Sequence, residues 1–211
     1  MKIKQLTITL FSLLLLALAT SAQVSQDTID AHKAAVEQFR AAKDALFSDP
    51  ATTPITASQQ QQFDGLIYFP VDYAYRLNAT YIPESNPRRE RLNLSNGGTQ
   101  RLIKSGKAVF TLNGIEYTLW VYQNDNLPEF TANPSQLFIP FKDATGAEQT
   151  ERNGRYLAIV PPQQGGLFTL DFNLAANPYG GYDSSIPSVL PPPENVLLAP
   201  LPTGERKYDD R

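Results

Sequence analysis

The sequence predicts a mainly β protein that begins with one helix. Three observations support this fold class: apolar residues recur at helical spacing before residue 48, apolar and polar residues alternate in several runs after residue 65, and Asn-Gly or Gly-Gly pairs separate some of those runs. Short connections between strands favour antiparallel pairing. We therefore expect an antiparallel curled sheet, barrel or sandwich, with one N-terminal helix and a Pro-rich C-terminal segment wrapped around it.

Residues 1–22 have the pattern of a secretory signal peptide. Lys2 and Lys4 form a basic start. Leu10–Ala19 is an almost uninterrupted apolar run, too short for a helix that spans a bilayer. Small residues precede Gln23, where the mature chain is expected to begin. The sequence therefore predicts export to the periplasm or the exterior, with no stable membrane anchor after cleavage; an uncleaved anchor is the alternative.

Residues 23–62 are predicted to form a helix and a linker. Apolar residues spaced by three, four or seven positions mark one face of a helix over residues 27–47: Ile29, Val36, Phe39, Ala42 and Leu46. Asp27 is the expected N-cap, because a carboxylate can accept a hydrogen bond from a free N–H of the first turn. Asp49 and Pro50 end the helix, since proline cannot continue it.

Residues 63–204 are predicted to form the β domain. Alternation of apolar and polar residues, or a short apolar run, marks each strand. We expect strands at Leu66–Phe69, 75–81, 92–94, Ala108–Leu112, Ile115–Val121, Leu137–Phe141, Arg155–Val160 and Gly166–Phe172. Asn113-Gly114 is the strongest hairpin signal, because both residues tolerate positive φ. Trp120 and Tyr122 share one side of their strand, and we expect them to be buried under the helix; an aromatic binding platform on the outer face is the alternative.

The C-terminal part is rich in Pro, Gly and Asn. The three prolines at 191–193 cannot enter the interior of a sheet. We expect this segment to wrap around the β domain and to cover exposed strand ends, because uncovered sheet edges promote aggregation. The last residues, 205–211, are charged and are expected to form a frayed tail.

The composition excludes several kinds of chemistry. The 211 residues contain no Cys, which excludes disulfides, zinc–thiolate sites, iron–sulfur clusters and thiol catalysis. The single His, His32, argues against a site with several His ligands and against a Ser-His-Asp triad, and we expect it to face solvent. The net charge of −3 gives no support for nucleic-acid binding. We therefore predict no metal site, no cofactor and no nucleic-acid partner.

Seven strings occur in an order that matches a known family: FRAAKDALFSDPATTP, FDGLIYFPVDYAYRLNATY, GKAVFTLNGIEYTLWVYQ, LFIPFKDATGAEQT, GRYLAI, LDFNLAANPY and LPPPENVL. On these strings, which span roughly residues 35–204, the chain resembles the bacterial domain-of-unknown-function 1684 family. The resemblance implies an exported or cytoplasmic protein of mainly β structure with no assigned activity. The family often has one Cys after the position of Asn177-Pro178 and another before the Pro-rich string. This chain has neither, so any thiol or disulfide role is absent from it.

The later motifs collect polar residues that form the best candidate binding site. They are Asp143, Thr145, Arg155, Tyr156, Asp171, Asn173, Asn177, Glu194 and Asn195. Arginine offers a planar fork for a carboxylate or phosphate, and tyrosine offers a stacking face with a hydroxyl tip. The alternative is that these side chains hold irregular backbone in place, as Asp–Arg pairs and turn-forming Asn residues do.

The order of the predicted strands indicates which of these residues meet. Asp143 follows one strand and Arg155 begins the next, so an up-and-down arrangement places both at the same rim of the sheet. We therefore expect them to pair. Asp171 ends the following strand, at the opposite rim, and it joins them only if the C-terminal segment folds back across the sheet.

Two classes of function fit the sequence. The first is a non-catalytic module that binds a small-molecule ligand without redox or metal chemistry. The alternative is a carboxylate-dependent hydrolase in which Asp143, Asp171 or Glu194 acts as acid or base. Such an enzyme needs at least two of these carboxylates in one pocket, so their positions distinguish the two classes.

Overall fold

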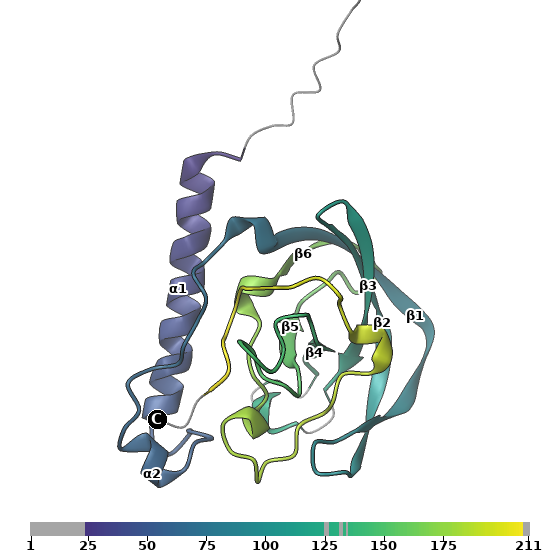
Figure 1. Cartoon of the computed structure of the whole chain (residues 1–211). Coiled ribbons are helices and arrows are strands. Elements are labelled where there is room, and N and C mark those ends of the chain that lie inside the picture. The colour runs from purple at the N-terminus through teal and green to yellow at the C-terminus, as the bar shows by residue number, and fades with distance from the viewer. Residues whose placement is uncertain (1–23, 125–126, 131–132, 134, 209–211) are drawn as a thin grey trace, which may run out of the picture.

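A computed structural model describes residues 24–208 apart from 125–126, 131–132 and 134. The predicted signal peptide and its cleavage site lie outside the described residues. Helix α1, Gln26–Ser48, runs along one side of a curled sheet (Figure 1). The short helix α2 is Ala57–Gln60, and one-turn 3-10 helices occur at Tyr73–Tyr75 (η1), Pro128–Phe130 (η2), Phe172–Leu174 (η3), Tyr179–Gly181 (η4) and Pro193–Asn195 (η5).

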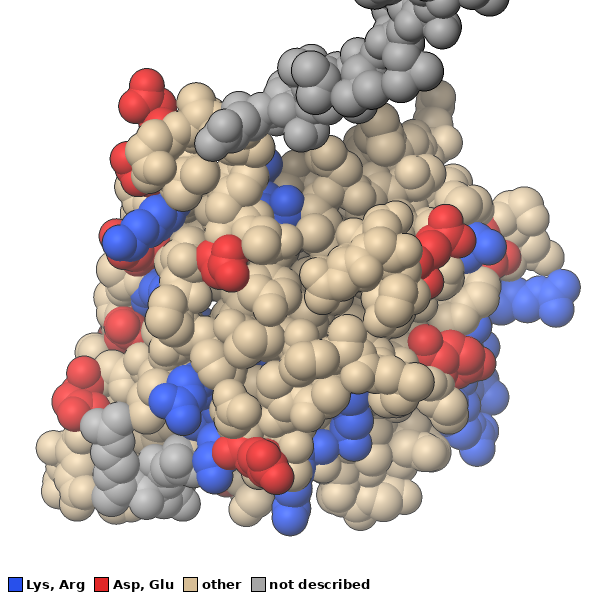
Figure 2. Space-filling model, turned by 45° about the horizontal axis from the view of Figure 1, so that its top comes forward, with Lys and Arg blue, Asp and Glu red and all other residues tan. Residues whose placement is uncertain are grey.

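Helix α1 has nearly the predicted extent but a different N-cap. The hydroxyl of Ser25 accepts a hydrogen bond from the Thr28 backbone N–H at 3.2 Å, so Ser25, not Asp27, is the cap. Asp27 lies in the first turn, where a negative charge faces the positive end of the helix dipole. Figure 2 shows acidic and basic side chains interspersed over the outer side of α1, at the left of that view.

The strands form one antiparallel sheet with the order β5-β4-β3-β2-β1-β6. They are β1 Arg76–Asn93, β2 Thr99–Leu112, β3 Ile115–Gln123, β4 Leu137–Phe141, β5 Arg155–Ile159 and β6 Gly166–Asp171. Strand β6 returns to pair with β1, so β5 and β6 are the two edges. The sheet curls into a half-barrel whose two edges both face α1, since residues of all three elements line one cavity. The predicted fold class is confirmed.

The Asn113-Gly114 turn has the geometry that the sequence predicted. The φ angle is 53° at Asn113 and 78° at Gly114, and Leu112 pairs with Ile115 in the register. Positive φ at both central positions matches the right-handed twist of the flanking strands. This register directs one set of side chains from β2 and β3 into the core: Ala108, Phe110, Leu112, Leu119 and Val121.

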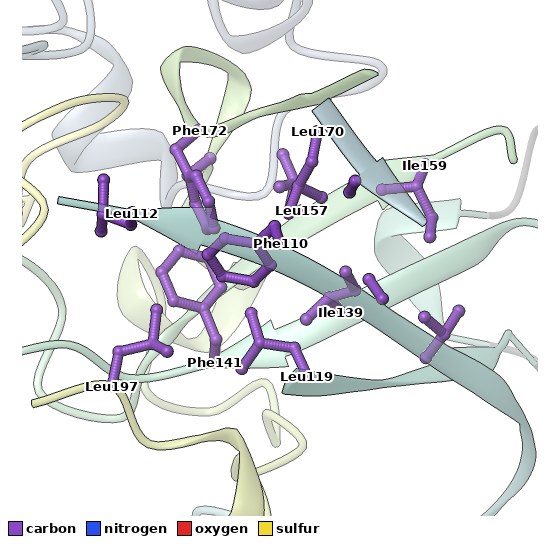
Figure 3. Packing of buried hydrophobic residues seen from close by; sticks show 14 of the residues in the cluster. Phe110, Leu112, Leu119, Ile139, Phe141, Leu157, Ile159, Leu170, Phe172 and Leu197 are labelled. Atoms are coloured by element: carbon purple, nitrogen blue, oxygen red, sulfur yellow. The ribbon is translucent and has the colours of Figure 1, made fainter. Parts of the chain in front are cut away.

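Three aromatic rings meet in the centre of the main core (Figure 3). The ring centroid of Phe172 lies 5.5 Å from that of Phe110 and 5.4 Å from that of Phe141. Aliphatic side chains surround these rings: Leu112, Leu119, Ile139, Leu157, Ile159, Leu170 and Leu197. Burial of each large apolar side chain contributes about 1.5–3 kcal/mol. Because Leu197 comes from the C-terminal segment, that segment is part of the core.

The Pro-rich C-terminal segment wraps around the sheet, as predicted. The buried side chain of Asn195 accepts a hydrogen bond from the Trp120 N–H (2.7 Å) and donates to the carbonyls of Trp120 (2.9 Å) and Pro140 (2.7 Å). The Lys142 N–H donates to the Asn195 carbonyl (3.0 Å), and the Leu197 N–H donates to the Lys142 carbonyl (2.8 Å). These bonds satisfy backbone groups along β3 and at the end of β4.

Two local predictions are wrong. Leu66–Phe69 is not a strand: Tyr68 makes an isolated bridge to Glu205, because the irregular C-terminal segment passes beside it. Trp120 and Tyr122 are not buried under α1. They pack into a second cluster on the opposite face of the sheet from the main core, together with Val189 of the C-terminal segment.

Candidate functional site

Two cavities lie along α1, between the helix and the sheet. The larger cavity has a volume of about 850 Å³ and is lined mainly by α1, β5 and β6, with Tyr73 of η1, Arg76 of β1 and Leu174 of η3. The smaller cavity has a volume of about 350 Å³ and is lined by α1, η2, β5 and residues 174–179. Phe39, Ala158 and Leu174 line both, so the two cavities adjoin. Their volumes are those of small-molecule sites.

Apolar residues of α1 that the sequence assigned to the core line these cavities instead. Phe39 is 43% exposed and Leu46 is 39% exposed. Both line the smaller cavity together with Ala42. The buried residues of α1 are Val36 and Phe47, so the helix is rotated relative to the predicted orientation. A single exposed apolar side chain is common, but a contiguous group of them is typical of a surface that binds a ligand or a partner.

The inner side of α1 also carries four ionisable side chains: His32, Arg40, Lys43 and Asp44, the last of which accepts from the Leu66 N–H. They occur at helical spacing from the buried residues Val36 and Phe47, so they project from the same side of the helix. Each reaches a hydrogen-bond partner outside the helix. These contacts, together with apolar packing, fix α1 against the rest of the protein.

His32 lies in the larger cavity, and the prediction that it faces solvent is wrong. Its Nε2 lies 2.6 Å from Asp171 Oδ2, and its side chain is 7% exposed. The His32 ring packs edge-on against Tyr73, with centroids 5.2 Å apart. The second oxygen of Asp171 accepts hydrogen bonds from the N–H (3.0 Å) and side-chain amide (2.9 Å) of Asn173. Asp171 therefore links the end of β6 to the N-terminal half of α1.

A buried polar cluster of Lys43, Asn177, Tyr182 and Glu205 lies beside the smaller cavity. Lys43 Nζ donates to Glu205 Oε2 (2.5 Å) and to the Tyr182 hydroxyl (2.9 Å). Tyr182 and Asn177 both donate to Glu205, the latter at 3.1 Å. Burial raises the pKa of Tyr182 well above its ordinary value, and the charge of Glu205 adds to this shift. Glu205 is 1% exposed, so the prediction of a frayed tail is wrong at this residue.

Two residues that line the smaller cavity each have a buried acceptor oxygen with no hydrogen-bond partner among the described residues: Glu129 (Oε2) and Asn177 (Oδ1). The other Glu129 oxygen accepts from the Tyr179 N–H at 2.8 Å. Burial raises the pKa of Glu129, and the Tyr179 hydrogen bond and the charge of Lys43 oppose that shift. A buried acceptor without a partner costs about 1–3 kcal/mol. A ligand that donates hydrogen bonds would remove this cost.

Asp143 and Arg155 form a buried ion pair, as the order of the strands predicted. Arg155 donates to Asp143 Oδ2 at 2.8 Å, and the two side chains are 1% and 2% exposed, respectively. The guanidinium also donates to the backbone carbonyls of Leu201, Thr203 and Glu205. Burial lowers the pKa of Arg155, and Asp143 opposes this shift. Neither residue lines either cavity. The pair holds the C-terminal segment against the end of the sheet.

The other predicted site residues are divided between structural roles and the cavities. Three of them hold backbone or a buried carboxylate in place: Thr145, Asn173 and Asn195. Three line cavities: Tyr156 and Asn177 in the smaller one, and Asp171 in the larger one. Glu194 is exposed and lines neither cavity. The carboxylates considered for a hydrolase have separate environments, because Asp143 pairs with Arg155, Asp171 contacts His32 and Glu194 faces solvent.

Sequence reasoning missed His32, Lys43, Glu129 and Glu205. A signal for the first two exists, since ionisable residues at helical spacing from Val36 on an otherwise apolar face need partners in the folded protein. Nothing in the neighbouring residues marks Glu129 or Glu205. The residues that surround them in the folded protein lie far away in the sequence: Lys43, for example, is 162 residues from Glu205.

These features define a class of protein: an antiparallel half-barrel with a helix along its open side and a small-molecule-sized cavity beneath that helix. Residues 61–206 match the family described as "Protein of unknown function (DUF1684)", and the chain belongs to this family. Glu129, Asn177 and Glu205 lie within the matched residues, whereas α1 precedes them.

A solved structure has a similar fold. It is the solution NMR structure of the uncharacterized protein from gene locus rrnAC0354 of Haloarcula marismortui, with 29% sequence identity and a TM-score of 0.66. The similarity covers 87% of this chain and 98% of that one. A comparison with curated proteins gave no match.

Two further features of the described residues bear on function. None of the helices within this part of the chain combines the length and apolar character needed to cross a membrane. The same residues contain no group of three or more His, Asp or Glu side chains placed to hold a metal ion. Among the described residues that line these cavities, the smaller cavity has two side-chain oxygens without a partner and the larger cavity has one ring nitrogen, His32 Nδ1.

Proposed function

We propose that the protein is a non-catalytic module that binds a small organic molecule in the smaller cavity. The observation that carries this proposal is the position of Phe39, Ala42 and Leu46, which line an open cavity although their helical spacing is typical of a packed core. Aromatic side chains from other elements face the same space: Phe130, Tyr156 and Tyr179. The apolar wall favours a ligand with an apolar body.

The polar end of the cavity supports binding of a ligand with a defined orientation. Glu129 and Asn177 line this end, and each has a buried acceptor oxygen with no partner among the described residues. Ligand sites typically combine a mainly apolar lining with a few such polar groups, which fix the orientation of the bound molecule. The smaller cavity has this combination.

The hydrolase alternative has less support. A carboxylate pair would have to share one pocket to act as acid and base. Asp143 is buried against Arg155, whereas Asp171 contacts His32. We therefore do not assign acid–base chemistry to these residues.

We also propose that the protein acts outside the cytoplasm. The support is the basic start, short apolar run and small residues of positions 1–22. N-terminal mass analysis of protein from the native envelope fraction should show a chain that begins at Gln23, with or without the loss of ammonia that cyclisation of Gln23 causes. A full-length cytoplasmic product would contradict export.

A matched pair of helix substitutions tests the binding proposal. Ala42 lines the smaller cavity, whereas its exposed neighbour Ala41 lines neither cavity. A library of small organic fragments is screened against the protein by ligand-observed NMR. We expect fragments that bind the wild type to lose binding to Ala42→Trp, which fills the cavity, and to keep binding to Ala41→Trp. The proposal is wrong if no fragment binds, or if both variants bind as the wild type does.

A further inference from the structure

Among the described residues, one carboxylate, Glu129, and one cation, Lys43, line the smaller cavity. The Lys43 Nζ lies 2.5 Å from Glu205 Oε2, so this cation has a carboxylate partner outside the lining. That contact balances the charge of Lys43 with the charge of Glu205. Glu129 has no ion-pair partner within the described part of the chain, and its Oε2 accepts no hydrogen bond there. One carboxylate therefore remains for a ligand.

The second unpartnered group, Asn177, is also an acceptor. The Asn177 Nδ2 donates to Glu205 Oε1 at 3.1 Å and to the Arg206 carbonyl at 2.7 Å. Both of these partners are acceptors, so the amide cannot be turned round without placing its oxygen against two other oxygens. The orientation of the Asn177 amide is thereby fixed, and Asn177, which lines the cavity, is 3% exposed. A ligand with donors that reach Glu129 and Asn177 would satisfy both acceptors.

The remaining wall is suited to a positive charge. Phe47, Phe130, Tyr156 and Tyr179 line the cavity with aromatic rings. The faces of such rings attract cations, by about 0.5–2 kcal/mol for each contact. A carboxylate ligand would instead meet the charge of Glu129, and a neutral alcohol has one donor for two acceptors.

We propose that the smaller cavity binds a protonated amine carried on an apolar body. This inference rests on the proposed function and adds the class of ligand. The ammonium group donates to Glu129 Oε2 and Asn177 Oδ1, and the apolar body packs against Phe39, Ala42 and Leu46 of α1. Each acceptor then has a donor, and the charge of Glu129 has a counterion.

Three probes that differ in the head group test this inference: 2-phenylethylamine, 2-phenylethanol and 3-phenylpropanoate. Binding to the purified protein is measured by calorimetry or NMR titration at neutral pH. We expect the amine to bind at least tenfold more tightly than the alcohol, and the carboxylate to bind more weakly than both. In Glu129→Gln the amine should lose at least tenfold in affinity, because the charge is removed and an N–H donor takes the place of Oε2 while the remaining oxygen accepts from the Tyr179 N–H. The alcohol should lose less than the amine, because its hydroxyl oxygen can accept from that N–H.

The matched control is Glu116→Gln, which removes an exposed carboxylate on β3 that lines neither cavity and should leave all three affinities unchanged. Circular dichroism shows whether each variant is folded. If the alcohol or the carboxylate binds as tightly as the amine, the inferred ligand class is wrong but the cavity remains a binding site. If no probe binds, the inferred ligand class is wrong, and the proposed function fails as well only if no fragment of the library binds the wild type. If the amine keeps its affinity in Glu129→Gln, the role given to Glu129 is wrong.

Discussion

Substitution of Arg155 by Ala is the most informative test of the fold around the C-terminal segment. It removes the ion pair with Asp143 and the hydrogen bonds to the carbonyls of Leu201, Thr203 and Glu205. The Asp143 side chain, 2% exposed, would then be a buried carboxylate without its cation. Removal of one partner of a buried ion pair typically costs about 3–5 kcal/mol in the free energy of unfolding. We expect a loss of about 4 kcal/mol.

Urea denaturation followed through the fluorescence of Trp120, the single tryptophan, measures this loss. With an m-value of about 2 kcal/mol per M, the midpoint should fall by about 2 M. Arg152→Ala is the matched control, since Arg152 is exposed and close to Arg155 in the chain, and it should change stability by no more than about 0.5 kcal/mol.

A second comparison separates the ion pair from packing. The double variant Asp143→Asn with Arg155→Met removes both charges and should be more stable than Arg155→Ala alone, because no unpaired buried charge remains. If Arg155→Ala unfolds at the same urea concentration as Arg152→Ala, the assignment of Arg155 to a structural role is refuted. A loss of ligand binding at unchanged stability would instead place Arg155 in a ligand site.

Three further predictions concern the hairpin, the buried cluster and the cavity wall. Gly114→Val should lower the free energy of unfolding by about 1–3 kcal/mol, because a β-branched residue disfavours positive φ. An unchanged melting temperature would contradict the turn geometry. Lys43→Met should lower the free energy of unfolding by about 3–5 kcal/mol, because it leaves Glu205 buried without its cation. Backbone hydrogen exchange near Glu205 should become faster. Unchanged exchange there would contradict the role of Lys43 in holding Glu205. Burial raises the pKa of Glu129 in the folded state. The ionised carboxylate therefore destabilises the folded protein at pH values above this raised pKa, and the destabilisation is absent at pH values below the ordinary carboxyl pKa. Glu129→Gln should therefore be more stable than the wild type at neutral pH, with a gain that shrinks on acidification; urea midpoints over a pH series measure it, and a gain independent of pH would oppose this account.

Much of the sheet could be predicted from the sequence because its signals are local. The Asn113-Gly114 pair fixes a hairpin through its own φ angles, and the alternation on either side fixes which residues face the core. Leu137–Phe141 was predicted with the observed bounds. The pairing of β6 with β1 was beyond such signals, because the strands are far apart in the chain and alternation does not identify the partner of a strand.

The candidate site was harder to predict than the sheet. The pairing of Asp143 with Arg155 follows from a connection that returns to the same rim, so it was accessible. The orientation of α1 could not be predicted, because Phe39 and Leu46 are as apolar as core residues. No neighbouring residue indicates that these side chains line a cavity. Glu205 was assigned to a frayed tail since its neighbours are charged. Its burial depends on Lys43, at the other end of the chain.

The contacts of His32 and Lys43 with residues far along the chain have a consequence for the order in which the molecule is assembled. The ribosome makes α1 before any strand, yet His32 meets Asp171 only 139 residues later, and Lys43 meets Glu205 only 162 residues later. Until then the nascent helix carries Phe39, Leu46 and Phe47 without these contacts, and exposed apolar side chains of this kind make an incompletely folded chain prone to aggregation. Contacts of such long sequence separation also slow folding. The part of the molecule made first is thus fixed in place by the part made last.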